Sequence, residues 1–358
     1  MKEFVPYNYA RAEKLAERTR AFYNGKKGKL QIQIRWVGGW KTTQSVKKPN
    51  QLILPDDMES YLDSIAIRDY QISRLHDSID DDMMCSTAPW YGIAEHSAFV
   101  GGEVTLERET SYCKPVCKEI TDFKKLSYSR DNMWAKLVID GMEYMREKWG
   151  EYIPVRLRGA YGPSDFANAI RGNDIFYDIY DSPEELAELL DFCTDAIHFF
   201  ADNQRKAATE IAGGVISGFS LWMPGNCIGH IAEDISVMLS PEMYEEVFIP
   251  EFKRCIDKYD FTMLHTHTLG HAILPIYASI DKIKAIEIAS DPKVDRPAKI
   301  FRKYHECLSD KVVNFSVNYD ELAELSDLYA DSKLVLMYSA KDEEDAKRAM
   351  SLVEKYRC

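Results

Sequence analysis

The sequence predicts an α/β protein, a (β/α)8 barrel of the TIM type with an N-terminal helical extension and a hairpin insertion. Three observations support this fold. Short apolar or alternating segments recur along the chain, and a segment with helical periodicity follows each. Eight such strand segments can be counted, which is the number that closes a parallel barrel. The chain has 358 residues, 46% of them hydrophobic, which is enough for one large core.

Composition narrows the class of partner. Asp and Glu total 58 against 45 Lys and Arg, and the net charge of −13 argues against a nucleic-acid or anionic membrane surface. The eight cysteines lack the short paired spacings of zinc ribbons and redox motifs. The first residues lack the apolar core of a signal peptide, and no window approaches the roughly 18 apolar residues of a membrane span. We therefore expect a cytoplasmic protein with a small-molecule substrate.

The amino-terminal part of the chain contains the first two predicted strands. Residues 10–24 have helical periodicity closed by Gly25, and residues 30–36 alternate as a first strand. A long amphipathic helix is expected over residues 56–77, and a second strand between residues 80 and 90. Residues 92–112 are expected to form a two-stranded hairpin over the barrel. We expect residues 1–60 to be an extension that packs on a barrel formed by residues 61–358.

The remaining strands alternate with helices. A helix over residues 133–149 precedes a third strand at 153–158. Ser182 and Pro183 are typical of a helix start, and this helix should run to about residue 206. The fourth strand is predicted at 213–222, followed by a long loop over 223–230. A helix over 243–259 leads to the last four strands, which are expected at residues 261–264, 283–288, 312–317 and 334–338.

The fifth strand ends in the residues that we consider the best candidates for chemistry. His265 and His267 are two positions apart on an extended chain, so both imidazoles leave the same face and can reach one zinc-sized ion or one substrate anion. Alternatively, they are polar residues that end a strand. Glu287 lies in an apolar strand, where an unpaired carboxylate is costly. We expect it to be the third metal ligand or a general base.

Other polar and aromatic residues also fall at predicted strand ends. Arg158 can pair with a substrate carboxylate through two hydrogen bonds, or form a salt bridge with Glu287 or Asp291. Glu233 and Asp234 are weaker candidates, since carboxylates are common at helix starts. The further catalytic candidates are Arg35 and Tyr161, and the candidates for substrate binding are Trp36, Trp90, Trp222, His230 and Tyr338, with Trp40 beside them.

Several motifs together resemble the uroporphyrinogen decarboxylase superfamily, which also contains corrinoid-dependent methyltransferases acting on methanol, methylamines and related donors. The resemblance covers residues 61–358. It rests on the two histidines of strand five and on these segments: Gly162-Pro163 and residues 170–183, 221–226, 239–250 and 345–356. The resemblance implies a barrel enzyme with its site at the carboxyl ends of the strands.

The two branches of this superfamily imply different chemistry. In the methyltransferase branch, strand five resembles His-x-Cys-Gly, and a second cysteine near strand eight completes a zinc site that activates a thiol. Here His265 matches the histidine, His267 replaces the cysteine, and strand eight has Tyr338 and Ser339 instead. In the cofactor-free decarboxylase branch, an arginine-rich amino-terminal segment holds substrate carboxylates, whereas this chain offers only Arg35 there.

Three functions follow. The first is methyl transfer from a small methylated compound to a corrinoid protein or a thiol, with zinc on His265 and His267. The second is a lyase of the decarboxylase type without a cofactor, in which Arg35 and Arg158 bind carboxylates. The third is a barrel without catalytic activity that binds a small ligand. A homodimer is compatible with the sequence, which specifies neither the substrate nor the oligomeric state.

Overall fold

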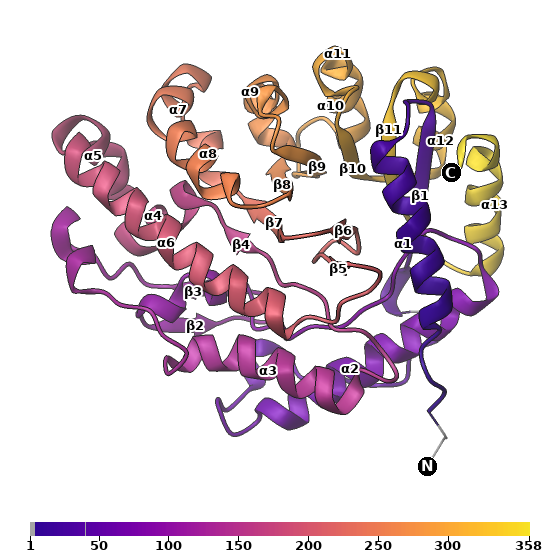
Figure 1. Cartoon of the computed structure of the whole chain (residues 1–358), viewed down its shortest axis with the longest axis horizontal. Helices are drawn as coiled ribbons and strands as arrows, with labels where there is room; N and C mark the ends of the chain where they lie inside the picture. The colour runs from indigo at the N-terminus through magenta and orange to yellow at the C-terminus, as the bar shows by residue number, and fades with distance from the viewer. Residues whose placement is uncertain (1–3, 40) are drawn as a thin grey trace.

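The computed structural model describes residues 4–39 and 41–358 and contains a seven-stranded sheet in which every pair of neighbouring strands is parallel (Figure 1). This confirms the α/β class. The strands follow the order β1-β11-β10-β9-β8-β7-β4. Their bounds are β1 Lys29–Trp36, β4 Ala160–Tyr161, β7 Cys227–Ala232, β8 Phe261–His267, β9 Ile283–Ala289, β10 Val312–Val317 and β11 Lys333–Ala340.

Helices surround the strands on their outer side (Figure 1). The helices are α1 Tyr9–Asn24, α2 Met58–Leu75, α3 Met133–Trp149, α4 Pro163–Arg171, α5 Ile175–Asp181, α6 Pro183–Ala207, α7 Pro241–Val247, α8 Ile249–Asp257, α9 Leu274–Ser279, α10 Pro297–Lys303, α11 His305–Leu308, α12 Tyr319–Glu324 and α13 Glu343–Val353. Within the described part of the chain, none of them combines the length and apolar character that crossing a bilayer requires.

The amino-terminal segment contributes directly to the sheet. Helix α1 ends at Gly25, as predicted, and β1 pairs in parallel with β11 over its whole length. The pairing joins the two ends of the chain, since residues near position 30 lie beside residues near position 335. The division of the chain at residue 60 stays a prediction.

The second and third predicted strands are mostly extended chain without a regular ladder. Among the described residues, the only β-bridge within these two segments is an isolated one between Thr87 and Val155. Asp82 N donates to Ile32 O of β1 at 2.8 Å, and its carboxylate accepts from Ile32 N. Because a carboxylate side chain takes the place of part of the backbone ladder, a strand predicted from its apolar pattern is not formed as such.

The prediction for the fourth strand is wrong. Residues 213–222 contain β5 (Gly214–Ile216) and the start of β6 (Trp222–Pro224), which pair with each other in a small antiparallel sheet apart from the main one. The strand of the main sheet is β7, which lies in the predicted loop. Gly225 has a φ of +66° and turns the chain between β6 and β7, a conformation that glycine adopts readily. The predicted hairpin is present as antiparallel β2 (Val104–Leu106) and β3 (Ser111–Cys113).

The sheet has an apolar face and a polar face. Leu264, Ile286 and Ile288 alternate with the polar positions and are fully buried under helices. Register partners in a parallel sheet point to the same side, so His265 shares its face with Glu287, which pairs across to β9. We call this side, which also carries Asn314, Ser339 and Arg35 through the register of β10, β11 and β1, the polar face.

Candidate metal centre

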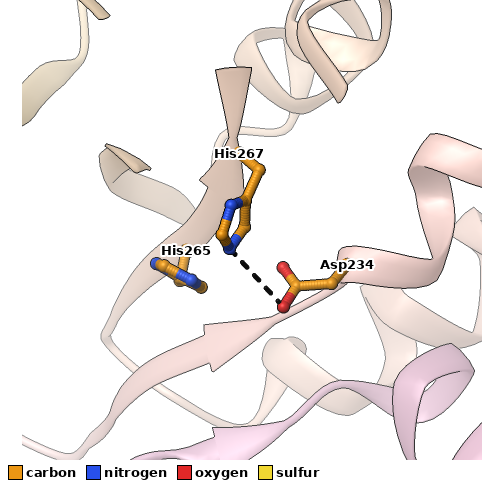
Figure 2. Close-up of side chains that lie close together, drawn as sticks. All are labelled: Asp234, His265 and His267. Carbon is orange, nitrogen blue, oxygen red and sulfur yellow. Dashed lines mark ion pairs between the residues drawn. The ribbon is translucent and has the colours of Figure 1, made fainter. Parts of the chain in front are cut away.

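Three ligand atoms gather at the carboxyl ends of β7 and β8. His265 and His267 leave the same face of β8, as predicted, and Asp234 follows directly after β7. One ligand atom from each of these residues lies within 4.8 Å of the other two. Figure 2 shows both imidazoles directed toward the carboxylate, with His267 Nε2 3.8 Å from Asp234 Oδ2.

Each histidine is oriented by a carboxylate on its other nitrogen. Glu287 Oε2 lies 2.5 Å from His265 Nδ1, and Asp291 Oδ1 lies 2.8 Å from His267 Nδ1. A carboxylate on Nδ1 favours the tautomer that keeps the proton there, which leaves Nε2 free to accept a metal ion. This carboxylate–histidine pairing is the outer-shell arrangement of many metal sites.

The local charges are consistent with this role. Burial lowers the pKa of His265, but Glu287 outweighs that effect, and the net result is a raised pKa. Burial raises the pKa of Asp291, whereas its hydrogen bonds from Leu269 N and His267 lower it more. The carboxylate of Asp291 is therefore held ionised, in the form that accepts a hydrogen bond from His267.

The donor set fits a divalent first-row ion. Two ligands about 2.0–2.1 Å from a tetrahedral ion lie roughly 3.3 Å apart, so the 3.8 Å between His267 and Asp234 needs a contraction of about half an ångström. Asp234 Oδ1 is buried without a hydrogen-bond partner among the described residues, which points to an absent ligand. Two imidazoles and a carboxylate suit zinc, iron and neighbouring ions, and leave positions open for a substrate.

The turn that carries Asp234 is anchored from behind. Asp165 accepts hydrogen bonds from Asp234 N and Ile235 N at 2.9 and 2.8 Å. Glu233 accepts from Ser164 and from Tyr244, and burial raises its pKa to about 7. These contacts fix the backbone next to the candidate ligand. A cleft of about 270 Å³, lined by Tyr112, Tyr161 and Asp234, leads to Asp234 from the side of the hairpin.

No protein-family model matches the chain. Two curated relatives do, both named methylcobamide:CoM methyltransferase MtbA. The protein from Methanosarcina acetivorans is 26% identical over 193 residues, and that from Methanosarcina mazei 25% over 193 residues. Each match covers 53% of this chain and 52% of the relative, so the chain spans about half the length of the curated relatives it matches.

At the level of a superfamily, the matched half of the chain is related to these methyltransferases. This distant homology confirms the resemblance inferred from the sequence motifs.

A second group of predicted residues lies next to the candidate metal centre. The ring of His230 is 6.3 Å from that of His265. Arg158 is buried and stacks on Trp90, with its guanidinium carbon 4.3 Å from the ring centroid. Tyr161 lines the cleft beside Asp234, and burial raises its pKa, with Asp165 and Asp234 adding to the effect.

Arg35 lies on the same polar face as His265, but on β1, which β11, β10 and β9 separate from β8. Solvent reaches its side chain, although neighbouring protein atoms enclose it enough to lower its pKa, an effect that the charge of Glu287 opposes. Glu287 itself, predicted as the third ligand, bonds to Nδ1 of His265. The third member of the ligand cluster is Asp234, whereas we expected Glu287.

Three predicted binding residues are directed elsewhere. Trp36 donates to His76 Nε2 at 3.1 Å in the core. Trp222 is buried and donates to Ile211 O at 2.8 Å, and Tyr338 donates to Asp345 of α13 at 3.1 Å. The structure does not bring them to the ligand cluster, and Trp40 lies outside the described residues.

The sequence gives only a weak signal for some of the residues that the fold brings to the centre. Asp234 is a weaker candidate in the sequence, since carboxylates are common at helix starts, and Asp291 is a strand-end residue that could equally pair with Arg158. The signal for both was their position, directly after a strand end. Glu95, which is fully buried and bonds to Arg158 at 2.6 Å, had no signal because it lies in a short 3-10 turn before β2, inside the segment predicted as a hairpin.

Proposed function

We propose that this protein is a metal-dependent methyltransferase that moves a methyl group between a small methylated compound or a methylcobamide and a thiol or a corrinoid protein. The observation that carries the proposal is the Asp234–His265–His267 cluster at the strand ends of a distant homologue of methylcobamide:CoM methyltransferases. Zinc is the first candidate metal. A bound divalent ion would lower the pKa of a thiol that reaches it, so that the thiolate becomes the nucleophile.

The chain's own residues have separate tasks in this proposal. Asp234, His265 and His267 hold the ion, while Glu287 and Asp291 keep each imidazole in the tautomer with a free Nε2. The proposed set has no thiolate, in contrast to the His and Cys ligands implied by the resemblance. One carboxylate and two neutral imidazoles leave a net positive centre, which attracts an anionic thiolate.

We further propose that the parallel sheet closes into the (β/α)8 barrel. Hydrogen bonds at both edges support this closure. The segment near Asp82 bonds to β1, Thr87 N donates to Pro154 O at 2.9 Å, and Leu157 N donates to Ile216 O at 2.9 Å. In a closed barrel the active site lies where the strands end, and accessory segments such as the β2–β3 hairpin cover it, leaving one side for a corrinoid protein partner.

The test is metal content combined with methyl transfer. Protein purified without chelator should contain close to one zinc per chain by elemental analysis. With methylcobalamin and 2-mercaptoethanol, it should release cob(I)alamin at a rate that a chelator abolishes. D234N and H267Q should lose both metal and turnover. H271Q is the matched control, because His271 lies on the same segment, outside the cluster, and bonds to Tyr304.

The lyase is the second candidate, since Arg158 and the accessible Arg35 provide cations for a carboxylate substrate. Substoichiometric metal in the wild type, with activity that chelators leave unchanged, would reject the methyltransferase and favour this alternative or a ligand-binding barrel.

A further inference from the structure

Three unpaired polar atoms lie in one region beside the proposed metal centre. They are Nη2 of Arg158, Nδ1 of His96 and Nδ1 of His230, and each is buried without a partner among the described residues. A buried donor or acceptor left without a partner loses the hydrogen bonds that water would give it, which destabilises the folded protein. Several such atoms in one place therefore indicate a ligand that pairs with them.

These groups are neighbours. The rings of His96 and His230 are 6.5 Å apart, and those of His230 and His265 are 6.3 Å apart. The pKa of His96 is lowered to about 3. Burial is the larger cause, and the nearby charge of Arg158 is the smaller one. His96 is thus a neutral ring, able to donate or accept one hydrogen bond at its free nitrogen.

Arg158 is held with one edge free. Its Nε donates to Glu95 Oε1 at 2.6 Å, and its face lies over Trp90. Glu95 is itself fixed by Tyr91 N at 2.9 Å. A guanidinium normally binds a carboxylate through two donors, so the unpaired Nη2 on a fixed guanidinium is a ready donor for a second anion.

The surroundings carry an excess of positive charge. Burial lowers the pKa of Arg156 to about 10; Asp69 opposes this effect, and the cations Arg158, Arg68 and Arg35 add to it. Arg156 still remains charged at neutral pH. Glu95 pairs with Arg158 and Asp69 pairs with Arg68, so Arg156 is a cation of this region that has no ion pair among the described residues, which favours a bound anion.

The register of the strands locates this region relative to the metal centre. His230 pairs with Met263, and Ala232 pairs with His265. His230 therefore lies one step of the polar face nearer the amino ends of the strands than His265. A molecule that enters from the carboxyl ends of the strands would therefore pass the metal centre before it reaches this region.

We propose that Arg158, His96 and His230 form a subsite for the anionic head group, carboxylate or sulfonate, of a short substrate whose reactive end remains at Asp234, His265 and His267. This inference rests on the proposed function for the identity of the reactive end. It adds that the substrate is an acid only a few bonds long and that it enters with the acid group first.

The test measures anion binding by metal-free protein, so that it can succeed even if the metal hypothesis fails. The probes are propanoate, ethanesulfonate and the neutral propanamide, compared at constant ionic strength by thermal shift and titration calorimetry after treatment with a chelator. We expect saturable binding of an anion and none of propanamide. Tighter binding of propanoate would assign a carboxylate head group, and tighter binding of ethanesulfonate a sulfonate.

The variant pair R158Q/E95Q removes both charges together, so that neither is left unpaired in the interior. We expect anion binding to weaken roughly 10- to 100-fold, the loss of one charge-assisted hydrogen bond. R158K, which keeps the charge but lacks the free fork nitrogen, should fall between, and serves if the double variant does not fold. The control R302Q/D327N removes an exposed ion pair. Equal binding of propanamide, or unchanged anion binding in both Arg158 variants, would overturn the proposal.

Discussion

Replacing Asp234 by asparagine tests the metal centre most directly, because it keeps the shape of the side chain and removes the only anion among the three proposed ligands. Loss of an outer partner of a metal-binding histidine typically lowers metal affinity 10- to 100-fold. Loss of a ligand's charge should cost at least as much as the larger figure. We expect zinc to bind D234N at least about 100-fold more weakly, which corresponds to about 2.8 kcal/mol.

The same substitution should stabilise the metal-free protein. Asp234 lies beside the buried carboxyl group of Asp165, whose pKa is raised well above its usual value first by burial and then by Asp234 and Glu233. Removing the carboxylate of Asp234 relieves the repulsion that disfavours ionisation of these two neighbouring carboxyl groups. The Asp234 side chain is 47% exposed, so solvent screens the gain to roughly 0.5–1 kcal/mol. For a chain of this size, the Tm should rise by about 1–2 °C.

The assay is a pair of measurements on each variant. Zinc affinity is measured by competition with a chromophoric chelator, and Tm is measured with and without zinc. Wild type should gain Tm on adding zinc, whereas D234N should start higher and gain little. H271Q should behave like the wild type. Zinc affinity of D234N within about threefold of wild type, or a lower Tm of the metal-free variant, would refute the reasoning.

Three further predictions follow from single contacts. E287Q should weaken zinc binding 10- to 100-fold in the same competition assay, since it loosens the hold on His265 Nδ1, without lowering the metal-free Tm by more than a few degrees. His96 stays neutral in the folded protein, with a pKa lowered to about 3 against 6.5 in the unfolded chain, so the unfolded chain binds more protons between these values. The free energy of unfolding should therefore fall as the pH drops through that window, by up to ~1.4 kcal/mol per pH unit. Denaturant unfolding of H96Q at several pH values should lack this contribution to the pH dependence. G159A should destabilise the fold by roughly 2–4 kcal/mol in denaturant unfolding, because its φ is +89° and a Cβ would lie 2.2 Å from His230 Cε1. A pH dependence unchanged in H96Q, or a wild-type unfolding midpoint in G159A, would contradict these two.

The sequence alone determined the features that depend on local pattern. Strands β8 to β11 are continuous apolar or alternating runs, and their positions were predicted within a few residues. The placement of His265 and His267 on one face followed from the period of two in an extended chain. The motifs that resemble the superfamily could also be recognised in the sequence, because the residues of each motif are contiguous in the chain.

The tertiary structure decided which carboxylate joins the histidines. Glu287 and Asp234 both lie at strand ends, and no local pattern distinguishes a ligand from a residue that orients one. The strand register places Glu287 directly beside His265 on the neighbouring strand, where its carboxylate bonds to Nδ1 of that histidine. The anchored turn after β7 brings Asp234 to the side of the rings that carries Nε2. Distances between residues on separate strands depend on how the strands pair and on the path of the loops that join them. Neither is specified by a local sequence pattern.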